Sequence, residues 1–176
     1  YYGIKTGFNK AFYIDSKTRD KLIDSDPHAI ELIKPLARGT DLRPWYKNNV
    51  EVWLITIPSG WTTSNFGGSS SEDEAWEKFS AHYPALSTYL YQFELQAKKR
   101  QDQGEFWWEL RSCDYYDEFE KTKIFWPIIG KIPRFSLDQE STYTNDSSFF
   151  LIPSSLSLLG ILQSRTIWFV ISQVCV

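Results

Sequence analysis

The chain has 176 residues, which is enough for one domain with a buried core. Its composition, 42% hydrophobic and 23% charged, is that of a globular protein, and its net charge of −3 argues against a uniformly basic nucleic-acid-binding protein. Aromatic residues make up 17% of the chain, so rings either fill the core or form stacking surfaces.

The charge is unevenly distributed along the chain. Residues 1–47 carry nine Lys or Arg against six Asp or Glu, and residues 121–176 carry five against three. Residues 48–120 carry five against thirteen. The acidity therefore lies in the middle of the chain, and its two ends can supply a local basic face.

The N-terminal part predicts one strand and one helix. The apolar run 11–14 follows two glycines that frame a turn and indicates a strand. Asp26 and Pro27 are typical of a helix start, because an N-cap side chain precedes a ring that presets φ. Helical spacing continues through Ile33 to Leu36, where the neighbouring Pro35 ends the helix.

The middle of the chain predicts a strand, a loop and a long helical segment. Residues 51–57 are β-branched and apolar and indicate a buried strand. Residues 59–71 are rich in Ser, Thr and Gly and indicate a surface loop. Residues 72–100 have helical patterning that restarts at Pro84, and the charges of 98–100 suit a helix end.

The C-terminal part predicts four strands and a last helix. The strands are expected at residues 106–110, 123–127, 134–138 and 149–152, and the helix near Ser155. Helices and strands come in blocks, so we expect a single α+β domain over residues 1–176. It should have a twisted, mainly antiparallel sheet, a central helical segment at about 72–100 and a C-terminal helix.

Two features bear on the cellular compartment. The apolar segment 156–176 contains Gln163 and Arg165 near its centre, which favours a packed helix over a membrane span. Cys113 and Cys175 have no metal-ligand spacing and do not form a disulfide framework. Without a signal peptide, we expect a cytoplasmic protein. The chain contains no Met and starts at Tyr1, so we expect a fragment of a longer protein.

No catalytic motif stands out in the sequence. There is no Pro-Pro pair, hence no Asn-Pro-Pro-aromatic loop of an adenine methyltransferase, and the Gly-Gly pair at 67–68 lies in a Ser-rich loop. The acidic stretch 114–121 is typical of a solvated face rather than a metal site. His28 and His82 have no nucleophile context. The residues alone indicate an aromatic-rich module without an active site.

Several blocks, read in order, resemble the TaqI-like C-terminal specificity domain, a target recognition domain. The blocks are residues 3–12, 19–23, 33–36, 38–43, 83–86, 99–100, 107–111, 119–124, 133–138, 145–146, 158–164 and 168–169. The resemblance implies a bacterial restriction-modification protein that methylates adenine N6, of the Type IIG class where a nuclease is fused. This fragment would bind double-stranded DNA beside the methyltransferase domain of its parent chain, with no membrane contact. It would carry no catalytic residue, metal or cofactor, because S-adenosylmethionine belongs to the parent catalytic domain.

The candidate DNA-contacting residues fall in two segments. In the glycine-framed turn, backbone amides and a short hydroxyl can hold a phosphate. In the window 121–134, cations alternate with aromatic residues and no acid intervenes, and such cations can reach phosphates or guanine edges. An ordinary turn and solvated charges are the alternatives. The candidates are Lys5, Thr6, Asn9, Lys121, Lys123, Trp126, Lys131 and Arg134.

Two other classes remain open. A carbohydrate-binding module would use some of the eight Trp to stack on sugars, although the helical stretch 72–100 does not fit a secreted β-sandwich. A structural docking domain of a larger enzyme would need no ligand. Binding to random-sequence DNA would distinguish a recognition domain from a carbohydrate-binding module. Exchange of the segment between relatives would leave sequence specificity unchanged if the segment were a docking domain.

Overall fold

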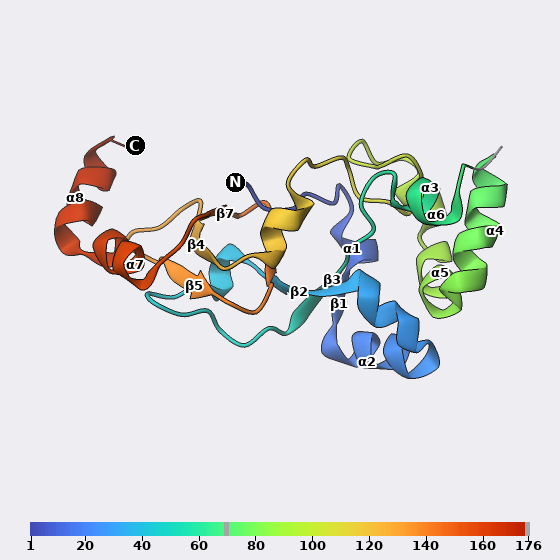
Figure 1. Ribbon diagram of the computed structural model, residues 1–176, viewed down its shortest axis with the longest axis horizontal. Helices are drawn as coiled ribbons and strands as arrows, with labels where there is room; N and C mark the ends of the chain where they lie inside the picture. Colours follow the sequence, from blue (N-terminus) through green and yellow to red (C-terminus); the bar gives the residue numbers. More distant parts are fainter. Residues whose placement is uncertain (69–70, 175–176) are drawn as a thin grey trace. The chain divides into compact units, whose positions relative to one another are not determined.

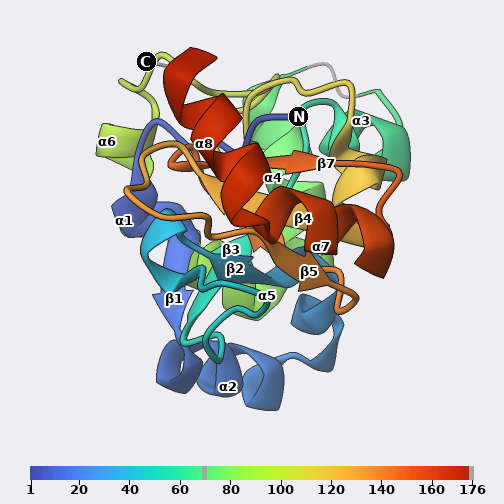
Figure 2. The same cartoon turned by 90° about the vertical axis from the view of Figure 1, so that its left-hand side faces the viewer.

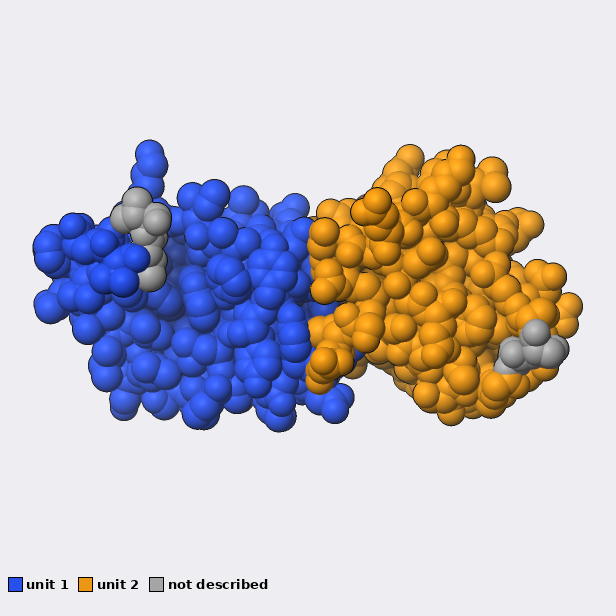
Figure 3. All heavy atoms as spheres, turned by 90° about the horizontal axis from the view of Figure 1, so that it is seen from above, with its two compact units in different colours: residues 1–4, 35–50, 115–176 blue, residues 5–34, 51–114 orange. Residues whose placement is uncertain are grey.

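The structure is a computed structural model that describes residues 1–68 and 71–174. Contacts divide the chain into two compact units, each built from separate stretches of sequence (Figure 3). Unit 1 contains Tyr1–Ile4, Pro35–Val50 and Tyr115–Val176, and unit 2 contains Lys5–Lys34 and Glu51–Asp114. The α+β class is confirmed (Figure 1). The expected single domain stays a prediction.

Unit 1 is built on a three-stranded antiparallel sheet in the order β5-β4-β7. Strand β4 (Lys123–Pro127) lies between β5 (Ser136–Asp138) and β7 (Ser148–Leu151). The central strand has the bounds that its apolar run predicts. Its residue Phe125 pairs with Ser136 on one side and Phe150 on the other, and all three are buried.

Two helices cover one face of this sheet (Figure 2). Helix α7 (Leu156–Gln163) begins at Ser155, whose side chain accepts a hydrogen bond from the Leu158 amide, and α8 (Arg165–Val174) follows. Leu159 of α7 joins Ile124 and Phe135 in the core. The single expected helix is therefore two helices, and Cys175 and Val176 lie outside the described residues. Among the residues that the structure describes, no helix combines the length and apolar character needed to cross a membrane.

The helix expected after Asp26 is wrong beyond Leu32, where the helical residues end. Asp26 does cap an N-terminus, since it accepts from the His28 amide, but the element is a 3₁₀ helix, η1 (Pro27–Leu32). The next residues form strand β2 (Ile33–Ala37), whose end pairs in parallel with β6 (Tyr143–Thr144) in unit 1. Pro35 does not support helical hydrogen bonding, and a distant strand supplies the partner instead.

Unit 2 combines helices with β1 and β3, neighbouring strands of a sheet with the order β1-β3-β2-β6. Strand β1 (Tyr13–Asp15) pairs antiparallel with β3 (Val52–Ile55), which confirms the expected strand at 51–57. The expected strand at 11–14 is only partly correct, because its first half lies in helix α1. The helices are α1 (Asn9–Phe12), α2 (Ser16–Ser25), α3 (Trp61–Phe66), α4 (Glu72–His82), α5 (Pro84–Tyr91) and α6 (Glu94–Ala97). Helices α4 to α6 confirm the helical segment at 72–100.

Two further expectations in unit 2 are corrected. The loop at 59–71 contains helix α3, because Trp61 packs against Phe79 and Tyr83; residues 69–70 lie outside the described residues. The strand expected at 106–110 is a set of turns around Glu109. This buried carboxylate accepts hydrogen bonds from the backbone amides of residues 60, 62, 105 and 106, which hold the turns together.

Unit 1 also contains two short 3₁₀ helices, η2 (Gly39–Asp41) and η3 (Tyr116–Glu120).

The two units differ in charge. Unit 1 carries eight Lys or Arg against seven Asp or Glu, and unit 2 carries eleven against fifteen. The acidity of the chain is thus concentrated in unit 2.

Candidate nucleic-acid interface

The predicted phosphate-binding turn in unit 2 satisfies its own polar groups. Thr6 is buried; its hydroxyl donates to Asn9 Oδ1 at 2.6 Å and accepts from the Phe8 amide at 3.1 Å. Lys5 lies 3.1 Å from a carboxylate oxygen of Asp102. The side chains of Thr6 and Asn9 therefore hold the turn, and the charge of Lys5 is partly neutralised.

The side chain of Arg100 holds this turn by a hydrogen bond to its backbone. The sequence indicated a charge at a helix end, and in the structure Arg100 is buried. Its guanidinium donates to the carbonyls of Thr6 at 2.6 Å, Trp107 at 3.0 Å and Glu109, and it lies over the ring of Phe12. Arg100 thus joins the turn at Thr6 to the turns around Glu109 through their backbone oxygens.

Lys123 is placed in the interior of unit 1, which corrects its assignment as a DNA contact. Its side chain has no exposed surface, and its Nζ lies 2.9 Å from Oδ2 of the equally buried Asp138. The ammonium also donates to the carbonyls of Phe119 and Lys121. Burial lowers the pKa of Lys123, and the charge of Asp138 offsets part of this effect. An enclosed ammonium does not reach a phosphate, so Lys123 has a structural role.

Lys121 is exposed but already paired. Its Nζ lies 2.6 Å from Oε1 of Glu118, and this hydrogen bond raises the pKa of Lys121. Because the carboxylate would have to be displaced before a phosphate could take its place, Lys121 is a weaker candidate than the sequence suggested.

Lys131 and Arg134 lie on the loop between β4 and β5, residues 128–135. Lys131 is exposed, and no ion pair to it is found among the described residues. Arg134 is half-buried and donates from Nη2 to the Ile129 carbonyl at 2.8 Å, which closes the loop. Ile129 at its tip is 82% exposed. Of the predicted cations in unit 1, these two remain open to a partner.

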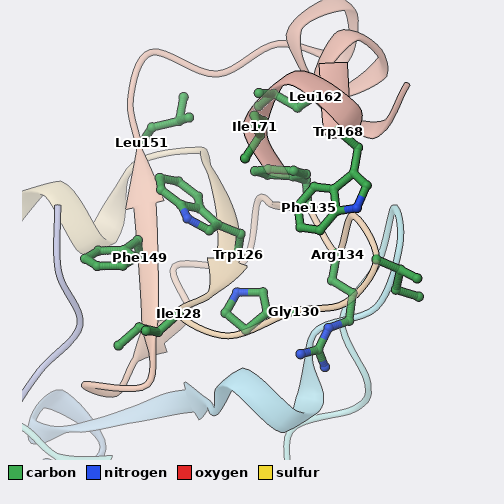
Figure 4. A pocket seen from close by; sticks show the side chains of 12 residues that line it. Trp126, Ile128, Gly130, Arg134, Phe135, Phe149, Leu151, Leu162, Trp168 and Ile171 are labelled. Atoms are coloured by element: carbon green, nitrogen blue, oxygen red, sulfur yellow. The ribbon is translucent and has the colours of Figure 1, made fainter. Parts of the chain in front are cut away.

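A cavity of about 500 Å³ adjoins this loop (Figure 4). Trp126 lies in its wall with ring centroids 5.8 Å from Phe135 and 5.7 Å from Phe149. Arg134 lies at the side opposite Leu162. The lining is otherwise apolar and comprises Trp126, Pro127, Ile128, Gly130, Ile132, Phe135, Phe149, Leu151, Leu162, Trp168 and Ile171. Trp126 is therefore part of a ring-lined hollow, half-buried rather than free on the surface.

Sequence reasoning missed a second element beside this loop, the turn 43–46. The Trp45 amide donates to the Phe135 carbonyl at 2.9 Å, so the turn runs alongside the end of the β4–β5 loop. Trp45 and Tyr46 are both more than half exposed. The signal available in the sequence was two consecutive aromatic residues after a proline in a stretch, 42–50, that contains no acid.

Comparisons with known proteins bear on the fold. No protein-family model matches the chain, and no curated protein matches it in sequence. One similar solved structure is the Type IIL restriction-modification enzyme MmeI, determined in complex with DNA. The TM-score is 0.58 at 12% sequence identity, over 93% of this chain and 20% of that enzyme. The chain thus shares a fold with part of MmeI and spans about a fifth of its length.

Two sequence features bear on metal and cofactor binding, the metal-ligating residue types and the Gly-Gly pair at 67–68. Within residues 1–68 and 71–174, no three His, Cys, Asp or Glu side chains gather to hold a metal ion. Gly67 and Gly68 follow helix α3, and a Cβ at either position would meet no atom within 4 Å. The Gly-Gly pair therefore does not form a close cradle of the kind that holds S-adenosylmethionine.

A second cavity, of about 360 Å³, lies in unit 2. Tyr83 in its wall donates to Glu31 at 3.1 Å, and His82 lies beside it. The rings of His28 and His82, far apart in sequence, come within 5.9 Å. Burial and the hydrogen bond to Glu31 raise the pKa of Tyr83 to about 12, so its hydroxyl is neutral at ordinary pH. The cavity is lined by Glu31, Leu32, Trp61, Asn65, Phe66, His82 and Tyr83, with no cation to attract DNA.

Proposed function

We propose that this chain is the DNA-recognition domain of a bacterial restriction-modification protein that methylates adenine N6. The observation that carries the proposal is a surface of unit 1, here called the recognition surface, made of residues 42–47 and 128–135. It contains no acidic residue, exposes Lys131, includes the half-buried Arg134, and adds the exposed rings of the 43–46 turn. The fold shared with part of MmeI, an enzyme solved with DNA, supports this choice.

The two cations of the recognition surface suit different tasks. Lys131 is a solvated point charge on a loop tip, which fits a phosphate contact. Arg134 has a planar guanidinium fixed on one side by the Ile129 carbonyl, which fits the O6 and N7 atoms of guanine. Affinity would come mainly from the first kind of contact and sequence preference from the second.

Chemistry would then lie elsewhere in the parent protein. A methyltransferase domain of the same chain would hold S-adenosylmethionine and the target adenine, and Type IIG membership would add a nuclease. This fragment would position the duplex in the bacterial cytoplasm, with double-stranded DNA and the catalytic domain as its partners.

The test is selection of bound duplexes from a random-sequence DNA pool by the 176-residue chain, followed by affinity measurements against salt. We expect one short sequence to be enriched. Lys131→Ala should weaken binding to every sequence and reduce the salt slope by about 0.9. Arg134→Ala should relax the preference at one base pair, with a loss of about 1–3 kcal/mol for the selected site.

Lys99→Ala, an exposed lysine of unit 2, is the matched control and should change neither quantity. A chain that enriches no DNA sequence, or that binds as tightly without both cations of the recognition surface, contradicts the proposal. Enrichment of a glycan on an array would instead indicate a carbohydrate-binding module. Unchanged sequence specificity after exchange of this segment between relatives would indicate a docking domain.

A further inference from the structure

The 43–46 turn exposes two large rings side by side in the sequence. Trp45 is 55% exposed and Tyr46 is 58% exposed. Among the described residues, no ring stacks on either of them, although most aromatic side chains of the chain pack in clusters. Because burying a tryptophan or tyrosine ring is favourable, two adjacent exposed rings indicate a surface that binds another molecule.

The backbone of the turn is held in an unfavourable conformation. Trp45 has φ 79°, in the left-handed region that a bulky residue enters only when its surroundings impose it. Strain of this kind gathers at sites that bind ligands, where it fixes a side chain in advance. The conformation therefore marks the turn as a candidate binding site.

The surroundings impose this conformation through buried hydrogen bonds. The hydroxyl of Ser136, which has no exposed surface, is shared between the carbonyl oxygens of Arg43 and Tyr46, 2.8 Å from each. The Arg43 amide donates to the Tyr46 carbonyl at 2.9 Å, and the Trp45 amide donates to Phe135. Both ends of the turn are thus fixed to strand β5 and the residue before it.

The guanidinium of Arg43 forms hydrogen bonds within this segment of the chain. Its Nη1 donates to the carbonyls of Thr40 at 2.6 Å and Leu42 at 2.9 Å. Nearby, Lys47 forms an ion pair with Glu140. The turn itself therefore offers rings rather than free charge. The open cations lie on the neighbouring loop, where Arg134 directly precedes Phe135, the acceptor of the Trp45 amide, and Lys131 lies three residues earlier.

Exposed rings with cations at their side match the chemistry of nucleic acid, in which flat bases alternate with phosphates. Aromatic side chains stack on bases of any sequence, and rigid apolar wedges enter base steps that proteins unstack. A neutral sugar would also stack on a ring, but it does not account for the cations Lys131 and Arg134 on the neighbouring loop. A rigid presentation lowers the entropy lost on binding.

We propose that the Trp45–Tyr46 turn is a rigid wedge whose rings stack on nucleobases at a locally unstacked step of the bound duplex. The inference rests on the proposed function, because it assigns a second mode of contact to the same recognition surface. Lys131 and Arg134 account for charge and hydrogen bonding, whereas Trp45 and Tyr46 account for stacking.

Trp45→Gly tests the wedge, because glycine removes the ring and adopts a positive φ without strain. For the DNA selected by the wild-type chain, we expect affinity to fall on the order of tenfold to a hundredfold, as for loss of a stacked base. The salt slope should stay unchanged, since no phosphate contact is lost. The free energy of unfolding should not fall, because the substitution relieves strain.

Trp45→Phe should recover most of the affinity, and Tyr46→Ala should also weaken binding. Phe169→Ala is the matched control: this ring lies in the same unit on helix α8, is 65% exposed and has ordinary helical backbone. It should leave affinity unchanged.

The direct readout is 2-aminopurine placed at each position of the selected site in turn. With the wild-type chain, its emission should change at one step, and Trp45→Gly should abolish that change. If Trp45→Gly binds as tightly as the wild type while Lys131→Ala still lowers the salt slope, the wedge is overturned and the proposed function stands. If the wild-type chain binds no DNA, both fall.

Discussion

Lys123 and Asp138 face each other across strands β4 and β5, with Nζ and Oδ2 2.9 Å apart and both side chains fully buried. One of the four cations in the most basic window of the sequence therefore points inward, where it pairs with the carboxylate directly opposite it on the neighbouring strand. Asp138 also accepts from the Thr142 amide at 3.0 Å, so the pair lies within a hydrogen-bonded network.

Lys123→Met is expected to destabilise unit 1 by about 3–5 kcal/mol, because it leaves the Asp138 carboxylate buried without its cation. Chemical unfolding followed by tryptophan fluorescence measures the change. Lys121→Met is the control: it removes the exposed ion pair between Lys121 and Glu118 and should cost less than about 1 kcal/mol. Equal stability of the two variants would show that Lys123 is not enclosed as described.

Tyr83→Phe is expected to make stability less sensitive to alkaline pH. The pKa of Tyr83 rises from 10.0 to about 12 because of burial and its hydrogen bond to Glu31. Below about pH 10 the hydroxyl is neutral in both the folded and the unfolded chain. Between about pH 10 and 12 only the unfolded chain loses the proton, so this residue costs stability as the pH rises, on the order of 2 kcal/mol in total.

Unfolding by urea at several pH values up to about 11.5 measures this difference. The free energy of unfolding of the wild type should fall more steeply above pH 10 than that of Tyr83→Phe. Below about pH 9 the variant should be weaker by about 0.5–1.5 kcal/mol, for the lost hydrogen bond. Tyr91→Phe, on an exposed ring, is the control. Parallel pH curves for the wild type and Tyr83→Phe would refute the assignment.

Arg100→Lys is expected to cost roughly 2–4 kcal/mol despite keeping the charge. An ammonium lacks the planar fork that reaches the carbonyls of Thr6, Trp107 and Glu109 together, and at least one buried acceptor is left unpaired. Hydrogen exchange of the amides in residues 5–9 should quicken with the global loss of stability. Lys99→Arg, next to it but exposed, should leave stability within about 0.5 kcal/mol.

Ser136→Ala is expected to loosen the 43–46 turn and so to misplace the rings of Trp45 and Tyr46. Ser136 is buried and does not touch DNA, yet its hydroxyl holds the carbonyls of Arg43 and Tyr46. We expect a stability loss of about 1–2 kcal/mol and weaker binding of the selected duplex. Added to Trp45→Gly, it should weaken binding no further.

Ser154→Ala is the control for this prediction, since its hydroxyl donates to the exposed Thr122 carbonyl away from the turn. A Ser136→Ala chain that loses stability but binds DNA as the wild type does would separate the fold from the recognition surface and remove Ser136 from a positioning role.

Elements with strong local signals could be predicted from the sequence. The apolar run at 123–127 marks β4 residue for residue, and Pro84 separates α4 from α5 as its missing amide requires. Asp26 and Ser155 each cap a helix start through a side-chain oxygen, as their positions indicate. These features depend on neighbours within a few residues, so the local sequence is sufficient.

Other features depend on partners far along the chain. Helix α3 forms in a Ser-rich stretch because Trp61 packs on α4 and Glu109 receives its first amides, and Ile33–Ala37 is a strand because β6 offers it hydrogen bonds. The sequence by itself determined the α+β class, the central helical segment and a basic C-terminal window. Only the tertiary structure decided that Lys123 lies inside while Trp45 lies outside, because burial depends on which distant groups pack around a side chain.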